Sequence, residues 1–402
     1  MGDLLRDLYE MTAFSAIAED PYCLLMLLLA VVVLYLGIFK QYEPLLLVPI
    51  GFGLLLANIP GGQMAVISAA DNAEIANLPL PKIAADYGIM NMLYYALIKS
   101  GLLPPLIFLG VGAMTDFGPM LRNLKLAFFG AAAQIGIFTV LIGAIFIGFT
   151  PQEAGALGII GGADGPTAIY TSIKLAPHLL GPIAIAAYSY MALVPVIIPL
   201  VVSWTVSKKE LQINMKEQDR LYPSKREIKN LRLLKIMFPI VLTLLICLIV
   251  PSATPLLGLL LFGNLIKEVG SSTSRLFQAA SETIMNTATI FLGLTVGATM
   301  TAQTFLKADT LLIVAGGFLA FAISILGGIM AVKVHNYFVK KKINPLIGAT
   351  GLSAVPMASR VANEIALKHD PRNHLLQYAM ASNIAGVIGS AVAAGVLISQ
   401  LG

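Results

Sequence analysis

The stretch Gly161-Gly162-Ala163-Asp164-Gly165-Pro166-Thr167 decides how the rest of this chain can fold. It lies inside an apolar run from Ala154 to Leu175 in which Asp164 is the only acid. An ionisable side chain at membrane depth costs roughly 2.5–3.5 kcal/mol on insertion scales and usually serves a function. Because glycine and proline disfavour a helix interior, we predict a helix broken here, with free backbone groups facing a cavity. A carboxylate beside unwound backbone suits a small cation or a proton.

Composition places the chain among polytopic membrane proteins. Its 402 residues have a mean hydropathy of +0.85, and only 12% are charged, where a soluble chain carries about twice that share. The net charge of +5 does not indicate nucleic acid, because in a membrane protein the position of basic residues matters more than their sum. Cys23 and Cys247 lie in apolar runs and are interpreted as packing residues. No sequence motif for ATP, a dinucleotide or zinc is present.

The chain divides into two halves around a basic linker. Residues 205–235 hold nine Lys or Arg residues and four acids, unlike any other stretch of similar length. We predict an all-α polytopic membrane protein of about ten spans in two inverted-topology repeats, each with a discontinuous, re-entrant helix. The expected parts are an interfacial helix and first span (1–43), repeat 1 with the Asp164 break (44–204), a cytoplasmic basic loop and inverting span (205–253), and repeat 2 with a broken helix at Gly348–Ser353 (254–402).

Internal repetition supports the two halves. Ile107-Phe108-Leu109-Gly110 recurs as Ile290-Phe291-Leu292-Gly293, at an offset of 183 residues. Gly162-Ala163-Asp164-Gly165 has a counterpart in Gly348-Ala349-Thr350-Gly351, at an offset of 186. The order and spacing of the elements are therefore kept. Paired interrupted segments at corresponding positions are a sequence indicator of a transporter binding site.

The distribution of basic residues predicts the orientation. With the linker in the cytoplasm and the spans alternating, 21 of the 26 Lys and Arg residues fall on the cytoplasmic side. The segment with Asp164 then enters the membrane from outside, and the segment with Gly348 enters from the cytoplasm. Both chain termini are expected outside.

Several polar residues in the apolar parts are candidates for chemistry. Asn344, Gly348 and Ser353 belong to the second interrupted segment, and Arg360 follows it at the cytoplasmic end, where a guanidinium suits a carboxylate. A positive-inside anchor is the alternative interpretation of Arg360. Asn383 lies in an apolar span, where hydrogen bonding between helices is the alternative.

Tyr190 lies in mid-span and is interpreted either as a proton donor or cation ligand or as a packing residue. Because Asp164 is a single acid among neutral oxygen donors, Na⁺ is favoured over Ca²⁺ or Mg²⁺, and a proton competes for the same carboxylate. From the residues alone, the chain is an ion-coupled membrane protein.

Four stretches carry a family resemblance: GGADGPTAIYTSIKLAP (161–177), AYSYMALVPVIIPL (187–200), NPLIGATGLSAVPMASR (344–360) and ASNIAGVIGS (381–390). They resemble the β subunit of the sodium-pumping biotin-dependent decarboxylases, which act on oxaloacetate, methylmalonyl-CoA, glutaconyl-CoA or malonate. The resemblance covers nearly the whole chain from about residue 20. It implies a translocase-type enzyme of the bacterial or archaeal cytoplasmic (inner) membrane.

The resemblance also implies an activity and partners. A carboxyltransferase α subunit would load a biotin carrier protein. The β subunit would decarboxylate the carboxybiotin, consume a proton and drive Na⁺ outward. A small membrane γ/δ subunit and a trimer of β subunits are further expectations. Na⁺ and carrier-bound biotin are the implied cofactors.

By residue type, the family's Na⁺-binding aspartate falls on Asp164 and its intramembrane tyrosine on Tyr190. The resemblance thus implies Na⁺ ligands and proton-passing groups among five residues: Asp164, Tyr190, Asn344, Ser353 and Asn383. It places Arg360, Asn344 and Gly348 near carboxybiotin. A Na⁺-coupled secondary transporter of small organic anions, with Arg360 holding the substrate, is the alternative function.

Overall fold

The computed structural model describes residues 9, 11–19, 21–41, 43–67, 74–223, 230–354 and 356–402. Within these ranges the chain is built from helices, with no strand, as the sequence predicts. The helices of the first half are α2 (Ala13–Glu19), α3 (Tyr22–Ile38), α4 (Pro44–Ala57), α5 (Leu80–Tyr87), α6 (Ile89–Leu93), α7 (Leu103–Met114), α8 (Gly118–Arg122), α9 (Leu124–Ala133), α10 (Ile135–Ile147), α11 (Pro151–Gly158), α12 (Gly165–Leu175) and α13 (Leu180–Thr205). Those of the second half are α14 (Lys208–Leu211), α15 (Met215–Leu221), α16 (Leu231–Ile249), α17 (Leu259–Val269), α18 (Ser274–Gln278), α19 (Met285–Ala298), α20 (Ala302–Phe305), α21 (Ala308–Phe338), α22 (Leu346–Ala349), α23 (Met357–His369) and α24 (Leu376–Leu401).

Several of these helices are long and apolar enough to cross a membrane. Four described helices meet that test: Leu124–Ile147, Leu231–Ile249, Thr310–Phe338 and Leu376–Leu401. The number is up to six if each of two bent pairs is counted as one span, with bends of 65° between Ile98 and Leu103 and 67° within α13. The apolar helices α3 and α4 are shorter than a full span. The chain is therefore a membrane protein, and the predicted count of ten spans stays a prediction.

Both predicted helix breaks are present. In the first, α11 continues into a short 3₁₀ turn, Ile159–Gly162, and α12 starts at Gly165. Ala163, between them, has φ of +56°, a left-handed conformation unusual for a residue with a side chain. In the second, α22 ends at Ala349 and α23 starts only at Met357. The glycine and proline signals thus located real interruptions of the helices.

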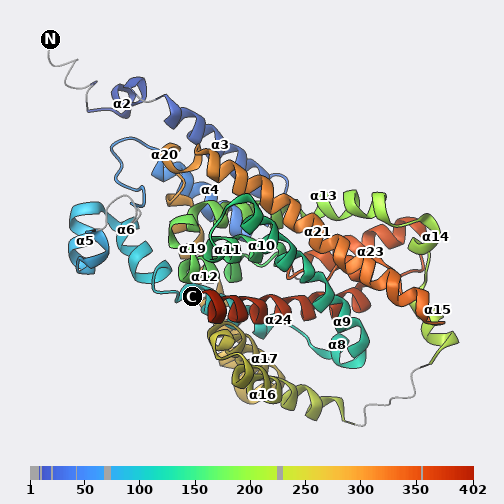
Figure 1. Ribbon diagram of the computed structural model, residues 1–402. Coiled ribbons are helices and arrows are strands. Elements are labelled where there is room, and N and C mark those ends of the chain that lie inside the picture. Colours follow the sequence, from blue (N-terminus) through green and yellow to red (C-terminus); the bar gives the residue numbers. More distant parts are fainter. Residues whose placement is uncertain are drawn as a thin grey trace.

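The two halves pack crosswise (Figure 1). The helix α4 lies on α19, and α17 lies on α7; likewise α13 packs on α21, and α24 packs on α9. Glycine allows two of these close approaches. A Cβ atom on Gly53 would lie 2.2 Å from the Leu294 carbonyl oxygen, and one on Gly112 would lie 1.8 Å from that of Leu260. Backbones can meet at such distances only where no side chain intervenes.

The basic linker is more ordered than the predicted loop. Its helices α14 and α15 form a strap beside α21 and α23 (Figure 1). Asp219 on α15 accepts hydrogen bonds from Lys341 Nζ and Tyr378 Oη, each at 2.6 Å. Capping side chains, Ser207 for α14 and Asn214 for α15, start each short helix.

Two parts of the prediction fall partly outside the described residues. Of the expected interfacial helix at 1–20, the structure describes α2, while residues 1–8, 10 and 20 lie outside the description. Three of the nine basic residues of the linker, Lys225, Arg226 and Lys229, also lie outside it.

Candidate ion site at the helix breaks

Asp164 is the N-cap of α12, the second half of the first broken helix. Its Oδ1 accepts a hydrogen bond from the backbone N–H of Thr167 at 3.1 Å. Aspartate is a preferred N-cap because the first amides of a helix have no partner inside the helix. The same helix end carries partial positive charge and stabilises the ionised carboxylate. Since Asp164 is only 5% exposed, this stabilisation acts away from bulk water.

The other carboxylate oxygen joins three separate elements. Asp164 Oδ2 accepts from Ser353 Oγ at 2.7 Å and from Ser390 Oγ at 2.8 Å. Ser353 belongs to the second helix break, and Ser390 lies on α24. The backbone of the two breaks is also bonded directly, from Ser353 N to the Gly162 oxygen at 3.0 Å. The two interrupted helices therefore meet at Asp164.

Buried oxygens without a described hydrogen-bond partner surround this meeting point. They include Asn383 Oδ1 and Gln134 Oε1. The Asn383 amide group donates to the carbonyls of Thr350 and Leu352, so its nitrogen is satisfied while its oxygen is not. An unsatisfied buried oxygen costs about 1–3 kcal/mol, which a bound cation offsets.

Gln134 and Ser390 both face the first break. A Cβ atom added to Gly162 would lie 3.1 Å from Ser390 Cβ and 3.6 Å from Gln134 Oε1. The Gln134 amide nitrogen is directed at carbonyls of the surrounding helices, those of Gly130 (3.3 Å), Gly351 (3.4 Å) and Gly386 (3.4 Å). One carboxylate and several neutral oxygens therefore converge at the breaks.

This donor set favours a monovalent cation. Among the described residues, no three His, Cys, Asp or Glu side chains gather where they could hold a metal ion. Divalent Ca²⁺ takes six to eight oxygens and usually several carboxylates. A single acid with hydroxyl and amide oxygens can neutralise one positive charge, either Na⁺ or a proton.

The Tyr190 hydroxyl is bonded to a group other than the carboxylate. It donates to the Val314 carbonyl of α21, and the Tyr190 ring packs 6.1 Å from that of Phe318. Tyr188 is the tyrosine against the first break: a Cβ atom on Gly165 would lie 2.3 Å from its ring. The Tyr188 hydroxyl is buried and has no hydrogen-bond partner among the described residues.

The remaining candidates also lie elsewhere. The Asn344 amide holds the strap, donating to the carbonyls of Leu211 and Ile213 at 3.0 Å each. Gly348 packs its backbone on α21, where an added Cβ atom would lie 2.1 Å from the Gly328 oxygen. Arg360 is exposed on the first turn of α23. Of the predicted residues, the structure therefore bonds Ser353 directly to Asp164.

Sequence reasoning missed Ser390, Thr167 and Gln134. A signal existed for Ser390, since it follows Asn383 by seven residues and so falls on the same helix face. Thr167 follows Asp164 by three residues, as an N-cap partner does. Gln134 carries no comparable local signal, because its role depends on helices that are distant in sequence.

Comparison with known proteins agrees with the resemblance. The family model for the Na⁺-transporting oxaloacetate decarboxylase beta subunit matches residues 23–401. The chain is 51% identical over 408 residues to the methylmalonyl-CoA decarboxylase subunit beta of Propionigenium modestum, with 100% of each chain covered. It is 47% identical to the oxaloacetate decarboxylase beta chain 2 of Salmonella typhi, with 94% of each covered. Its identity to the methylmalonyl-CoA decarboxylase subunit beta of Veillonella parvula is 48%, covering 94% of this chain and 92% of that protein.

Proposed function

The chain belongs to the family of the Na⁺-transporting oxaloacetate decarboxylase beta subunit, and on this premise we propose that it decarboxylates carboxybiotin and couples the reaction to outward Na⁺ transport. A proton is consumed in each turnover, because the ureido nitrogen takes a proton as its bond to the carboxyl carbon breaks and CO₂ leaves. Carboxybiotin arrives on a separate biotin carrier protein, loaded by a carboxyltransferase α subunit. A small membrane γ/δ subunit and a homotrimer of this chain complete the proposed complex.

One observation carries the proposal: a buried carboxylate lies where two broken helices meet, bonded to hydroxyls from the other half of the chain. A site formed by both halves can open to either side if the halves move relative to one another. The hydrogen bonds from Ser353 and Ser390 favour the ionised carboxylate, which is the form that binds Na⁺. Binding of Na⁺ to Asp164 and protonation of Asp164 are therefore mutually exclusive.

We propose roles for the other residues from their chemistry and their contacts. Asn383 and Gln134 offer oxygens to the cation. Ser353 and Tyr190 are the candidates to pass the proton, Ser353 through its bond to Asp164 and Tyr190 only once its hydroxyl leaves the Val314 carbonyl. Arg360, exposed on α23, is placed to meet the carboxylate of an incoming substrate. Asn344 and Gly348 support the second break from the strap and from α21, and so shape the approach to it.

We also propose the finer architecture predicted from the sequence: about ten spans in two inverted repeats, in the bacterial or archaeal cytoplasmic membrane. The crosswise pairs α4 on α19 and α17 on α7 support this arrangement, since α7 and α19 carry the repeated Ile-Phe-Leu-Gly motif and each packs on a helix of the opposite half. The proposed repeats cover residues 44–204 and 254–402. The basic strap then lies in the cytoplasm and the C-terminus outside.

The test is CO₂ release from carboxybiotin by the complex in liposomes, with ²²Na⁺ movement followed in the same sample. Asp164→Asn should abolish both, because the neutral amide can neither balance the ion nor take up the proton. The matched control is Asp86→Asn, which changes an exposed acid and should behave as wild type. Retention of Na⁺-stimulated CO₂ release in Asp164→Asn would refute the assignment. Na⁺ flux that ignores carboxybiotin but responds to an organic anion would favour a secondary transporter.

A further inference from the structure

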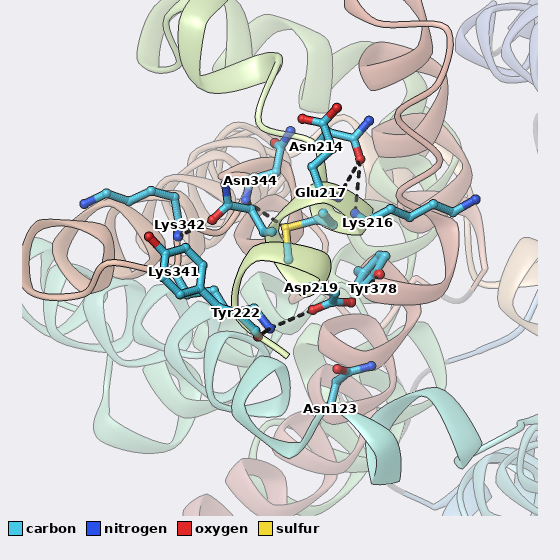
Figure 2. Close-up of polar contacts among 12 residues, drawn as sticks. Asn123, Asn214, Lys216, Glu217, Asp219, Tyr222, Lys341, Lys342, Asn344 and Tyr378 are labelled. Atoms are coloured by element: carbon cyan, nitrogen blue, oxygen red, sulfur yellow. Dashed lines mark hydrogen bonds and ion pairs between the residues drawn. The ribbon is translucent and has the colours of Figure 1, made fainter. Parts of the chain in front are cut away.

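A basic cavity of about 460 Å³ lies between α9, the strap and the end of α21. Arg122, Lys125 and Lys341 line it, and Asp219 is the carboxylate among its lining residues. Asp219 is already engaged with Lys341 and Tyr378, as Figure 2 shows. Arg122 and Lys125 pair with no acid within the described ranges. The cavity therefore carries excess positive charge that suits an anion.

An apolar groove of about 440 Å³ begins where this cavity ends. The two share Leu124, the first residue of α9. Helices α9 and α10 line one side of the groove, and α16 and α24 line the rest. Its lining residues include Ala131, Phe138, Phe238 and Ile388. Gln134 is the only polar side chain in that lining. The basic cavity and the apolar groove thus adjoin at the start of α9.

The polar-to-apolar order is the same on all three elements that flank the groove. On α8 and α9 the basic Arg122 and Lys125 precede Ala131, and on α16 Lys235 precedes Phe238. On α24 the polar Gln377 and Tyr378 precede the groove-lining part, 385–396. Residues 385–396 span about 16 Å along the axis of α24, which is close to half of the ~30 Å hydrocarbon thickness of a bilayer. The groove therefore has the depth of one leaflet.

We infer that this site binds an anionic phospholipid from the leaflet on the strap side. The phosphate lies with Arg122 and Lys125, and one acyl chain lies in the groove against α24. Basic pockets between membrane helices on the cytoplasmic side are a recognised lipid-binding arrangement, which agrees with the orientation proposed above. Charge and shape both favour an amphiphile over a free phosphate, because an inorganic anion would leave the apolar groove empty.

The bound chain would contact the ion site through Gln134. The Gln134 side chain packs on Gly389 of α24, at the groove, and its amide nitrogen faces the Gly351 carbonyl of the second break. Filling the groove therefore holds α24 and the second break together on one side of Asp164. The lipid is a structural ligand, and its removal loosens the packing between α24 and the second break.

Native mass spectrometry of the full-length chain in detergent tests the inference, with phosphatidylglycerol and phosphatidylcholine titrated separately. A basic residue near anionic lipid contributes about fivefold to affinity, so Arg122→Gln/Lys125→Gln should weaken phosphatidylglycerol binding roughly 25-fold. Phosphatidylcholine binding should change much less. The matched control is Lys82→Gln/Lys307→Gln, which removes two exposed lysines elsewhere.

A separate variant tests whether the apolar groove holds the acyl chain. Ala131→Trp fills the channel and should displace both lipids while leaving the basic cavity intact. Ile142→Trp, at a 52% exposed position of α10 outside the groove, is its control. Glycerol 3-phosphate should fail to compete with phosphatidylglycerol. Unchanged lipid retention in both site variants would overturn the proposal in favour of a protein helix or no occupant, and full competition by glycerol 3-phosphate would reduce it to a simple anion site.

Discussion

Removing the Ser390 hydroxyl should weaken Na⁺ dependence without destroying the enzyme. Ser390 is fully buried, and its Oγ lies 2.8 Å from Asp164 Oδ2 and 3.0 Å from the Val387 carbonyl. In Ser390→Ala the carboxylate keeps two donors, Ser353 Oγ and the Thr167 amide. The substitution leaves no new buried donor unpaired, so its effect falls on the ionised carboxylate.

The size of the effect follows from one charge-assisted hydrogen bond. Such a bond contributes about 1.5–3 kcal/mol, and each 1.4 kcal/mol is a factor of ten in an equilibrium. The half-saturating Na⁺ concentration should therefore rise roughly 10- to 150-fold. Because the lost bond favoured the ionised carboxylate over the protonated one, the deficit should be larger at pH 6 than at pH 8.

The assay is Na⁺-dependent CO₂ release by the reconstituted complex over a wide Na⁺ range at both pH values. The maximal rate at saturating Na⁺ should stay within a few-fold of wild type. Ser359→Ala is the matched control, since Ser359 is equally buried and its hydroxyl has no partner in the described chain. If Ser390→Ala and Ser359→Ala both gave wild-type Na⁺ curves, the serine pair would not hold the carboxylate during turnover, and the reasoning would fail.

Two further predictions concern stability. Gly348→Ala should lower the thermal unfolding temperature, at an overpacking cost of about 1–3 kcal/mol, because the added Cβ would lie 2.1 Å from the Gly328 oxygen. The control is Gly143→Ala, which should leave the unfolding temperature unchanged because nothing lies within 4 Å of its added Cβ. Equal melting curves for the two variants would contradict the close contact at Gly348. In the strap, burial opposes ionisation of Glu210, but hydrogen bonds from Ser207 and Lys333 prevail and lower its pKa below 4.5. Its stabilising contribution is therefore present above pH 4.5 and lost as pH falls through the lowered pKa. Wild type should lose more thermal stability than Glu210→Gln between pH 6 and pH 4, and parallel losses would count against the link.

Local sequence signals predicted the helix breaks, but the contacts between residues distant in the sequence could not be predicted from it. Glycine, proline and a lone acid within one apolar run were enough to place the interruption at Asp164. Its hydrogen-bond partners Ser353 and Ser390 are 189 and 226 residues away. Residue type alone identified Ser353 as a candidate, but nothing in the sequence states which hydroxyls the fold brings to one carboxylate.

Tyr188 and Tyr190 show a second limit. Two residues apart on an α-helix point about 200° apart, so only one of them can face the first break. Which one does depends on the rotation of α13 about its axis, and packing against α21 sets that rotation. Similarly, an asparagine in a polar segment can serve an ion or tie backbone carbonyls, and Asn344 does the second.

The side-chain amides explain how a broken helix can be stable and still leave oxygens for an ion. A break leaves carbonyls without helical donors, and buried carbonyls need them. Asn383 supplies its N–H groups to Thr350 and Leu352, and Gln134 supplies its own to Gly351 and Gly386. Each amide then has an oxygen left over, directed away from the carbonyls that it satisfies.

A hydroxyl or a carboxylate could not do both, because neither carries two donors and a separate acceptor. Loss of activity in Asn383→Leu would therefore not establish a ligand role, since that variant also leaves two carbonyls without donors. Asn383→Asp separates the effects: it keeps an oxygen, replaces the N–H donors with a second oxygen and adds one negative charge. An ion-ligand role predicts retained Na⁺ dependence with reduced thermal stability in that variant, whereas a purely structural role predicts that the Na⁺ response is lost in proportion to the folded protein.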